Sequence, residues 1–427
     1  MSEPKKVGRR TFLNYATAIV ATGVIVGAAT YLATPKGVET ITAPGATTTV
    51  TAPGATTTVT APGATTTVTA PGGATTVTVT APPGGTTTTP FMLSPFDIRT
   101  NEAEWVDTKP FRKDPPWIIG ICTAHRAPSW MAIWLKEIEC EINALAESEP
   151  GVKLVEKVIS VDSASDVSKE LGNMRDLVSA GADVIILDPV DPKGSAPIVE
   201  EVVSKGIPVI LPKNYCETEK YTAYSNNDEV QFGYTTAKWL AEKLGGKGNI
   251  LVFRGIPGYG VDLQRWAGAE MVFKQYPNIK ILDSEYGQWD YTTAKKLATD
   301  MLAAHPKFDG IWSMGGQMSA AMVDAMLEAG YDVSKYPHAG EDYNGFCKQI
   351  IKYNIPACMS CKPVWEGRVG VRNAFDALRG LPIRKNNVFP SPFFTAEDAK
   401  RIVRPDLPDQ VWVSTTLPGA ILKQMFA

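Results

Sequence analysis

Residues 181–212 read GADVIILDPVDPKGSAPIVEEVVSKGIPVILP, and this stretch decides the fold. The run 183–187 is apolar after its first residue and is bounded by polar and turn residues, which is typical of a strand buried on both faces of a parallel sheet. Apolar residues then recur at helical spacing over 198–203, Gly206 ends the helix, and 207–211 is the next buried strand. The order strand, loop, helix, strand predicts a right-handed crossover in a parallel α/β sheet.

Polar residues follow both of these strands. Asp188 comes directly after the first strand, and other polar residues come just after Leu211. Open parallel sheets bind ligands beyond the carboxyl ends of their strands, so we expect a polar ligand site here. The alternative is that Asp188 only caps the loop that follows it.

The composition is that of a globular protein with length for two or three domains. The chain has 427 residues, of which 44% are hydrophobic and 20% charged. Its net charge of −3 offers no basic field for nucleic acid. Six cysteines are too few for a disulfide scaffold, and three histidines argue against a His-rich metal site, so we expect no metal.

The N-terminus, residues 1–34, is predicted to be an export signal or a membrane anchor. Lys5, Lys6, Arg9 and Arg10 precede an almost uncharged apolar run over 15–33. GRRTFL at 8–13 resembles the twin-arginine export motif, with an ordinary secretory signal as the alternative. The positive charge on the N-terminal side predicts that the rest of the chain lies outside the membrane.

Residues 35–114 are predicted to form a Thr/Pro-rich stalk and linker. TAPGATTTV at 42–50 repeats identically at 51–59 and 60–68, and a looser copy follows. Such low complexity is typical of an extended, O-glycosylated stalk. A stalk between a membrane segment and a globular part predicts a tethered protein facing outward.

From about Pro115 onward, strands and helices alternate through two successive runs. The first contains the stretch 181–212, and the second restarts at a strand over 249–253. Two such runs predict two α/β lobes, each a doubly wound parallel sheet. The remaining residues, 384–427, are proline-rich and are expected to wrap the surface, with a last short helix over 418–426.

Several motifs share their order and spacing with one family. They are GADVIILDPVD, SKGIPVILP, the turn Ser225-Asn226-Asn227, Arg265-x-x-Gly268, AAHPKFDGIWS at 303–313 and AGED at 339–342. With them, residues 117–381 resemble the type I periplasmic sugar-binding proteins of ABC transporters, the ribose-binding group. The resemblance implies two lobes joined by a three-crossing hinge that close on a sugar. It also implies that the loaded form docks on a membrane permease.

The resemblance sets the expected boundaries of the lobes. Lobe 1 is expected to comprise 115–225 and 363–391, and lobe 2 to comprise 226–362 and 392–427. The three crossings are then expected near 225–227, 361–363 and 389–393.

The resemblance also implies which residues bind the sugar. Asp342 matches the family's sugar-binding aspartate, since a carboxylate accepts hydrogen bonds from neighbouring hydroxyl groups. Arg265 matches an arginine that donates to sugar oxygens. Trp289 and Trp130 match aromatic residues that stack on the sugar face. The alternatives are a solvated acid for Asp342, a surface salt bridge for Arg265 and core packing for Trp130.

Further positions complete the implied site or depart from the family pattern. Asp188 and Ser225 fall at contact positions. After Leu211 the family has an Asp-Arg pair, and here only Lys213 or Asn214 can supply the polar group. After the strand ending at Met314 the family has Asn-Asp, and here Gln317 is the nearest amide. These departures do not support ribose itself, and a different sugar, a polyol or another small polar metabolite fits equally well.

Three other functions are alternatives to transport: an enzyme, a sensor and a structural protein. Neither a nucleophile elbow nor a P-loop occurs, and GIPGYG at 255–260 lacks dinucleotide-binding spacing, so we expect no enzyme and no cofactor. The cysteines at 358 and 361 lie in a predicted strand, which favours a disulfide such as Cys347 with Cys358, or buried thiols, over a redox pair. A membrane-tethered sensor using the same cleft and a purely structural surface protein remain as alternatives.

Overall fold

The computed structural model describes residues 57–61, 64–68, 78–79 and 104–426. The predicted N-terminal segment 1–34 and most of the predicted stalk lie outside the described residues. Three short strands of the repeat region form a sheet in which β1 (Thr57–Ala61) pairs antiparallel with β2 (Ala64–Val68) and parallel with β3 (Thr78–Val79). These strands belong to one unit, Met1–Met92, and the described residues 104–426 belong to the other, Leu93–Ala427. None of the helices in the described part of the chain is long and apolar enough to cross a membrane.

Lobe 1 is built on a six-stranded sheet in the order β16-β9-β8-β7-β5-β6, with every pair parallel. The strands are β5 (Trp117–Thr123), β6 (Val155–Asp162), β7 (Val184–Leu187), β8 (Val209–Leu211), β9 (Ala223–Asn227) and β16 (Asn386–Phe389). The predicted crossover is confirmed, because β7 and β8 are wholly buried and α4 (Ala196–Ser204) joins them.

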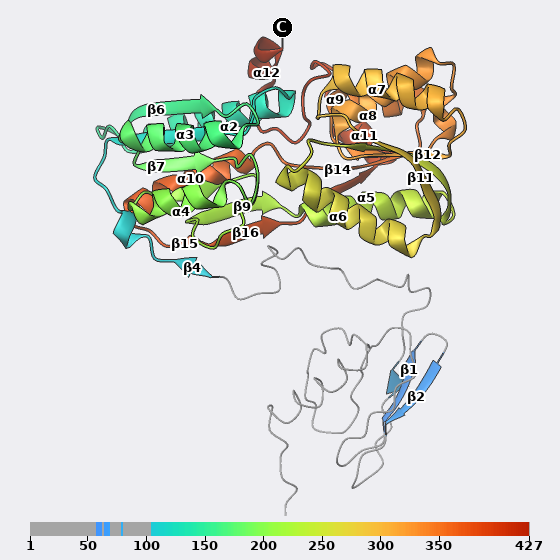
Figure 1. Ribbon diagram of the computed structural model, residues 1–427, viewed down its shortest axis with the longest axis horizontal. Coiled ribbons are helices and arrows are strands. Elements are labelled where there is room, and N and C mark those ends of the chain that lie inside the picture. Colours follow the sequence, from blue (N-terminus) through green and yellow to red (C-terminus); the bar gives the residue numbers. More distant parts are fainter. Residues whose placement is uncertain (1–56, 62–63, 69–77, 80–103, 427) are drawn as a thin grey trace, which may run out of the picture. The chain divides into compact units, whose positions relative to one another are not determined.

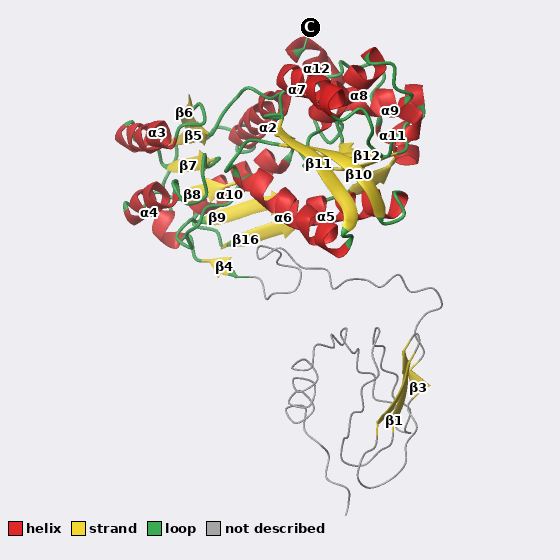
Figure 2. Ribbon diagram, turned by 45° about the vertical axis from the view of Figure 1, so that its right-hand side comes forward, coloured by secondary structure: helices red, strands yellow, loops and turns green. Residues whose placement is uncertain are grey.

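Helices cover both faces of this sheet, as Figures 1 and 2 show. Leu177 of α3 (Val167–Ser179) and Ile198 of α4 share a core with Ile185 and Leu187 of β7. The alternate residues of β7 face a second core with α2 (Ser129–Ala146) and α10 (Glu366–Arg379). A strand whose two faces are both apolar is thus explained by helices on both sides.

Lobe 2 repeats this architecture with the sheet order β11-β10-β12-β13-β14-β17. Only β17, at one edge, runs antiparallel to its neighbour. The strands are β10 (Lys247–Arg254), β11 (Asn278–Tyr286), β12 (Gly310–Ser313), β13 (His338–Glu341), β14 (Ala357–Ser360) and β17 (Phe393–Thr395). The helices are α5 (Glu229–Lys243), α6 (Gly260–Gln275), α7 (Tyr291–Ala304), α8 (Gly316–Glu328), α9 (Asn344–Tyr353) and α11 (Ala396–Ile402). The predicted fold class, two doubly wound lobes, is confirmed.

Helices α5 and α6 approach each other closely because each presents a glycine to the other's backbone. A Cβ atom on Gly233 would lie 1.8 Å from the carbonyl oxygen of Arg265, and one on Gly268 would lie 2.0 Å from that of Val230. Only glycine leaves room for this contact. The close approach sets the position of α6, which carries Arg265.

The chain passes between the two sheets at three points, after β9, after β14 and after β16. Hydrogen bonds tie these points together. Asn227 Nδ2 donates to Ser391 Oγ at 2.6 Å and to the carbonyl oxygen of Cys361 at 3.4 Å. Ser391 Oγ in turn donates to the carbonyl oxygen of Asp228 at 2.6 Å. The lobe 1 sheet extends to Asn227, two residues beyond the expected boundary.

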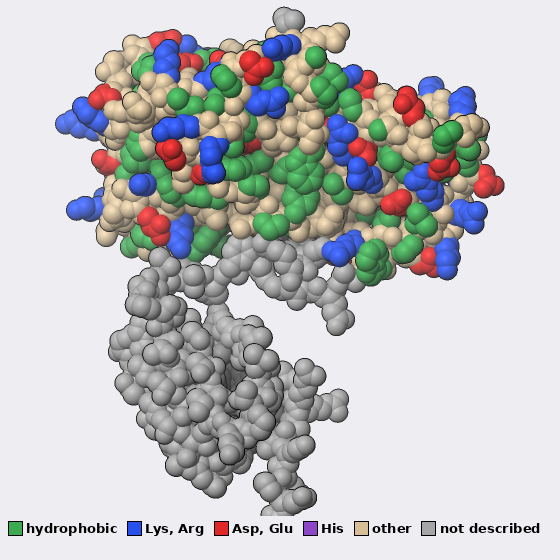
Figure 3. All heavy atoms as spheres, turned by 180° about the vertical axis from the view of Figure 1, so that it is seen from behind, with side chains coloured by type: hydrophobic (Ala, Val, Ile, Leu, Met, Phe, Trp, Pro, Cys, Tyr) green, Lys and Arg blue, Asp and Glu red, His purple; other side chains and the backbone are tan. Residues whose placement is uncertain are grey.

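Shorter elements complete the unit: β4 (Trp105–Val106), η1 (Lys109–Phe111), η2 (Val333–Lys335), β15 (Ile383–Arg384) and the final helix α12 (Gly419–Met425). The predicted last helix is confirmed as α12. All six cysteines lie within residues 104–426 and are free, so the disulfide expected between Cys347 and Cys358 is wrong. Cys347 Sγ instead lies 3.6 Å from Met359 Sδ in the core. Figure 3 shows basic and acidic side chains interspersed over one face, in keeping with the small net charge.

Candidate functional site

A cavity lies between the lobes, beyond the carboxyl ends of their strands, and its empty space is about 390 Å³ when solvent at its open side is included. This is where open parallel sheets bind ligands. Most of its lining residues come after the strands β5, β8, β10, β11 and β14. One is the last residue of β13, and one lies in the C-terminal tail. They are His125, Pro128, Trp130, Met131, Lys213, Tyr259, Val261, Arg265, Trp289, Glu341, Lys362 and Trp412.

Several aromatic side chains form part of the wall. Trp130 stacks on Trp134 at 6.2 Å between ring centroids and also lines the cavity. The predicted place in the binding site and the alternative of core packing are therefore both correct for this residue. Tyr259 meets the edge of Trp289 at 5.8 Å. Flat aromatic faces pack against the apolar C–H face of a sugar ring or a polyol.

Trp289 reaches this position through an uncommon backbone conformation. It has a φ of 47°, in the left-handed region that bulky residues rarely adopt. Its ring fills the space beside Gly255, where a Cβ atom would lie 2.2 Å from the indole. Such strain persists only where the surroundings hold it, and it is found preferentially at functional sites.

Lys213 and Asp188 form a buried ion pair at the ends of β8 and β7. Lys213 Nζ lies 2.9 Å from Asp188 Oδ2, and the hydroxyl of Tyr259 donates to Asp188 Oδ1 at 2.7 Å. Burial lowers the pKa of Lys213, and the Asp188 carboxylate opposes this. Asp188 therefore lies behind the wall, where it positions Lys213 and links lobe 1 to Tyr259 of lobe 2.

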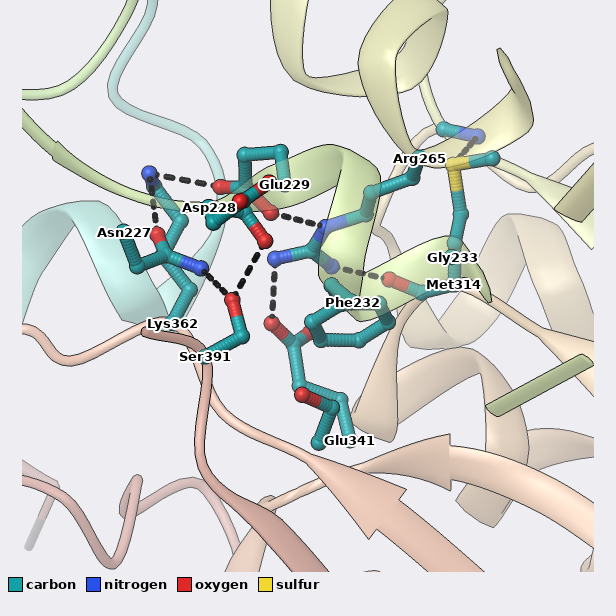
Figure 4. Close-up of polar contacts among 12 residues, drawn as sticks. Asn227, Asp228, Glu229, Phe232, Gly233, Arg265, Met314, Glu341, Lys362 and Ser391 are labelled. Carbon is teal, nitrogen blue, oxygen red and sulfur yellow. Dashed lines mark hydrogen bonds and ion pairs between the residues drawn. The ribbon is translucent and has the colours of Figure 1, made fainter. Parts of the chain in front are cut away.

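Arg265 is 1% exposed and paired with two carboxylates (Figure 4). Its Nε donates to Glu229 Oε2 at 2.7 Å, and its Nη2 donates to Glu341 Oε1 at 2.7 Å. The guanidinium lies over the ring of Phe232, 3.7 Å from its centroid. Burial alone would lower the pKa of Arg265, but the two carboxylates outweigh it and hold that pKa above its usual value. The surface salt bridge considered as an alternative is wrong, because the pair is buried.

Lys362 connects the hinge to this charge network (Figure 4). Its Nζ donates to Glu229 Oε1 at 2.8 Å and to Asn226 Oδ1 at 2.5 Å, and lies 3.1 Å from Glu366 Oε1. Glu229 is therefore shared between Lys362 at a crossing and Arg265 of lobe 2. Burial raises the pKa of Glu366 to about 8 despite Lys362.

His125 is the cavity residue whose polar atoms are unsatisfied. It is 8% exposed, and neither ring nitrogen has a hydrogen-bond partner among residues 104–426. Burial, with the nearby Lys213 charge, lowers its pKa to about 4, so the imidazole is neutral at pH 7. A neutral imidazole offers one donor and one acceptor, which matches the two capacities of a hydroxyl group.

Besides Asp188, three predicted site residues lie outside the cavity wall. Ser225 Oγ accepts a hydrogen bond from Asn373 Nδ2 at 3.0 Å inside lobe 1. Gln317 Oε1 accepts from Ser129 Oγ at 3.3 Å. Asp342 Oδ2 accepts from the backbone N–H of Ser414 at 3.0 Å, and burial, together with Glu341, raises the pKa of Asp342 to about 7.

The structure thus brings Trp130, Lys213, Arg265 and Trp289 together at the cavity, with Asp188 behind Lys213. Sequence reasoning did not select the other lining residues. His125, Tyr259 and Lys362 follow strands, and that signal was available. Trp412 follows no strand of either sheet, so the sequence contained no comparable signal for it. Within the described residues, no group of three or more His, Cys, Asp or Glu side chains is arranged to hold a metal ion.

Two lobes closing on a cavity at their strand ends define the class of two-lobed solute-binding proteins. The sequence profile of the periplasmic binding protein domain family matches residues 127–382, more than half of the chain. The chain belongs to this family, and its fold is that of the type I periplasmic sugar-binding proteins.

Individual relatives are distant. The chain is similar to the ribose import binding protein of Bacillus subtilis, at 25% identity over 230 residues, which is 54% of this chain and 74% of that protein. It is also similar to the xylitol-binding protein of Mycolicibacterium smegmatis, at 30% identity over 167 residues, which is 39% of this chain and 48% of that protein.

Solved structures agree with this fold. The fructose-binding periplasmic domain of a hybrid two-component system superposes with a TM-score of 0.59 at 25% identity, covering 67% of this chain and 93% of that one. The Caulobacter myo-inositol-binding protein superposes with a TM-score of 0.61, covering 68% and 97% of the two chains, and at 18% identity it shows the fold alone.

Proposed function

We propose that this chain is an extracytoplasmic solute-binding protein that captures a sugar or polyol between its two lobes and delivers it to an ABC transporter permease. The observation that carries this proposal is the cavity between the lobes, whose walls combine aromatic faces and polar groups from both lobes. Relatives named for binding ribose and xylitol support the ligand class.

The cavity residues take different roles in this proposal. Trp130 and Trp289 pack against the C–H faces of the ligand, and His125 exchanges hydrogen bonds with a hydroxyl group. Lys213, Arg265 and Glu341 supply charged donors and acceptors that are held in place by protein partners. Since these groups come from both lobes, a bound ligand favours the closed arrangement.

Asp188, Asp342, Gln317 and Ser225 act indirectly in the same proposal. Asp188 holds Lys213, and Asp342 holds the backbone at residue 414. Gln317 bonds Ser129 at the start of α2, and Ser225 bonds Asn373 within lobe 1. Each therefore supports the wall from behind.

The cellular setting is part of the proposal. Residues 1–34 export the chain and tether it to the membrane, and residues 35–114 hold the lobes away from the surface. The basic residues ahead of the apolar run support this. The named relatives are binding proteins, and we assign no catalytic role to the cavity.

A thermal-shift screen with ribose, xylitol, myo-inositol and fructose tests the function. A ligand that binds only the folded state at a hundredfold excess over Kd adds about 2.7 kcal/mol to the free energy of unfolding. We expect at least one of these compounds to raise Tm. No shift with any carbohydrate or polyol would overturn the proposal.

A membrane-tethered sensor that uses the same cleft is the second candidate. Its support is the similarity to the binding domain of a hybrid two-component system. The two functions differ in their partner, so a pull-down from membranes with the ligand-loaded protein separates them. A permease among the captured proteins supports transport, whereas a receptor kinase supports sensing.

A further inference from the structure

The C-terminal segment 411–417, called here the clasp, lies beyond residues 127–382 and contacts both lobes. Its first half is fixed to lobe 2. Trp412 forms an isolated β-bridge with Tyr343, and the backbone N–H of Asn344 donates to the carbonyl oxygen of Val411 at 2.9 Å. The N–H of Ser414 donates to the Asp342 carboxylate at 3.0 Å.

The second half of the clasp is fixed to lobe 1 through one buried carboxylate. Glu137 of α2 accepts from Thr415 Oγ1 at 2.8 Å, from the N–H of Thr416 at 2.7 Å and from Thr416 Oγ1 at 2.7 Å. Glu137 also pairs with Arg368 of α10. Hydrogen bonds to a carboxylate are stronger than those between neutral groups. Opening the lobes therefore requires one of the two anchors, Glu137 or Asp342, to release the clasp.

Trp412 precedes the residues held by the two anchors, Ser414 and Thr415–Thr416, and lines the cavity. It is 1% exposed and lines the cavity wall, although it comes from a segment outside both sheets. Its indole Nε1 donates to Ser129 Oγ at 3.1 Å in lobe 1, while its ring meets the edge of Tyr343 of lobe 2 at 5.5 Å. One side chain of the clasp thus contacts both lobes and the ligand space.

The helix that follows the clasp lies at the opposite edge of the two lobes from the hinge strands β9 and β16 (Figures 1 and 2). Figures 1 and 2 show β9 and β16 at the lower edge of the two lobes and α12, which follows the clasp, at the upper edge. In both figures, the chain after the clasp therefore ends far from the crossings that follow β9 and β16.

We propose that the clasp is a fourth connection between the lobes and that Trp412 is a ligand-contacting residue, so that ligand capture and clasp docking are coupled. The proposal rests on the proposed function for its ligand, a sugar or polyol. Withdrawal of the clasp from Glu137 removes one aromatic wall of the cavity, and a ligand packed against Trp412 holds the clasp in place.

Affinity measurements on the full chain test the role of Trp412. We expect Trp412→Ala to weaken binding of whichever of ribose, xylitol, myo-inositol or fructose binds the unaltered protein by about tenfold or more, as measured by calorimetry. Trp412→Phe keeps an aromatic face and should stay within about threefold. Trp105→Ala is the control, because Trp105 is 58% exposed on β4 and does not line the cavity. Unchanged affinity in Trp412→Ala overturns the proposal.

Hydrogen exchange tests the clasp without any ligand. The amides of Ser414 and Thr416 should be protected in the unaltered protein and exchange faster in the double variant Thr415→Val, Thr416→Val, which removes two hydroxyl donors to Glu137. If these amides are unprotected in the unaltered protein, the proposal that the clasp connects the lobes is wrong. If none of the four compounds binds that protein, the proposed function fails, and exchange alone decides whether the clasp joins the lobes.

Discussion

The two sides of the cavity are held by different chemistry. On the hinge side, Arg265, Glu229 and Lys362 form a buried chain of charges, each paired within 2.8 Å of a partner. On the clasp side, backbone N–H groups and threonine hydroxyls donate to two carboxylates, Glu137 and Asp342. Removal of one member of a buried charge chain leaves an unpaired charge, whereas the clasp has several neutral donors that release one at a time. The difference indicates a permanent hinge and a releasable clasp.

The largest effect is expected from Glu229→Gln, because it leaves both Arg265 and Lys362 short of a buried carboxylate. We expect the free energy of unfolding to fall by about 3–5 kcal/mol, measured by denaturant titration. The matched control on the same helix is Glu242→Gln, which breaks an exposed pair with Lys238. That change should cost about 0–1 kcal/mol. Equal losses of unfolding free energy in the two variants would contradict a special role of the buried charges at the hinge.

The next effect concerns the pH dependence of the clasp anchor Asp342. Its pKa in the folded state is about 7, against 3.8 for the unperturbed group. The folded state therefore binds more protons between these values, and the stability of the unaltered protein falls as pH rises from about 4 to about 7. Asp342→Asn removes this contribution. Relative to the unaltered protein, the free energy of unfolding of the variant should therefore rise by up to a few kcal/mol between pH 4 and pH 8, since one pKa unit is about 1.4 kcal/mol.

Chemical unfolding of both proteins at pH 4 and pH 8 checks this. The difference between the two proteins isolates Asp342 from Glu366 and Glu170, whose raised pKa values of about 8 and about 7 are common to both. If the two proteins differ in unfolding free energy by the same amount at both pH values, Asp342 does not titrate between them.

A smaller effect is expected for ligand binding by His125. His125→Phe keeps a ring of similar shape but removes both nitrogens, and each lost hydrogen bond is worth about 0.5–1.5 kcal/mol. We expect the Kd for the bound sugar or polyol to rise by about tenfold in calorimetry. His305→Phe, at a partly exposed site paired with Asp283, should leave the Kd unchanged. Equal Kd values for all three proteins would remove His125 from the binding site.

The smallest effect is expected from Thr415→Val, which removes one of the three clasp hydrogen bonds to Glu137. The loss should be about 1 kcal/mol of unfolding free energy. Thr299→Val provides the comparison, because Thr299 only donates to the carbonyl of Lys295 within its own exposed helix turn. A loss at Thr415 as large as that for Glu229→Gln would show that the clasp is as rigid as the hinge.

Much of the fold could be predicted because its signals are local. The apolar runs at β7 and β8 and the helical spacing of α4 specify the strand–helix–strand unit without knowledge of distant residues. The strand-end rule also placed Lys213 at the cavity.

The prediction at β13 selected Asp342, and the structure places its neighbour in the wall. Successive side chains of a strand point to opposite sides, and Glu341 is the last residue of β13. Glu341 lines the cavity and pairs with Arg265, while Asp342 contacts the clasp. A resemblance identifies the end of the strand. It does not decide which of two neighbouring residues faces the cavity, because neighbours on a strand point in opposite directions.

The amino-acid order alone specified two α/β lobes with a ligand site at their strand ends, because apolar periodicity and turn residues act over a few positions. The charge pairing of Arg265 and the position of Trp412 depended on how distant segments meet. Thr416 and Glu137 are 279 residues apart, and Lys362 and Glu229 are 133 apart. No local pattern encodes such partners, since their interaction arises only when packing has buried both and removed competing water.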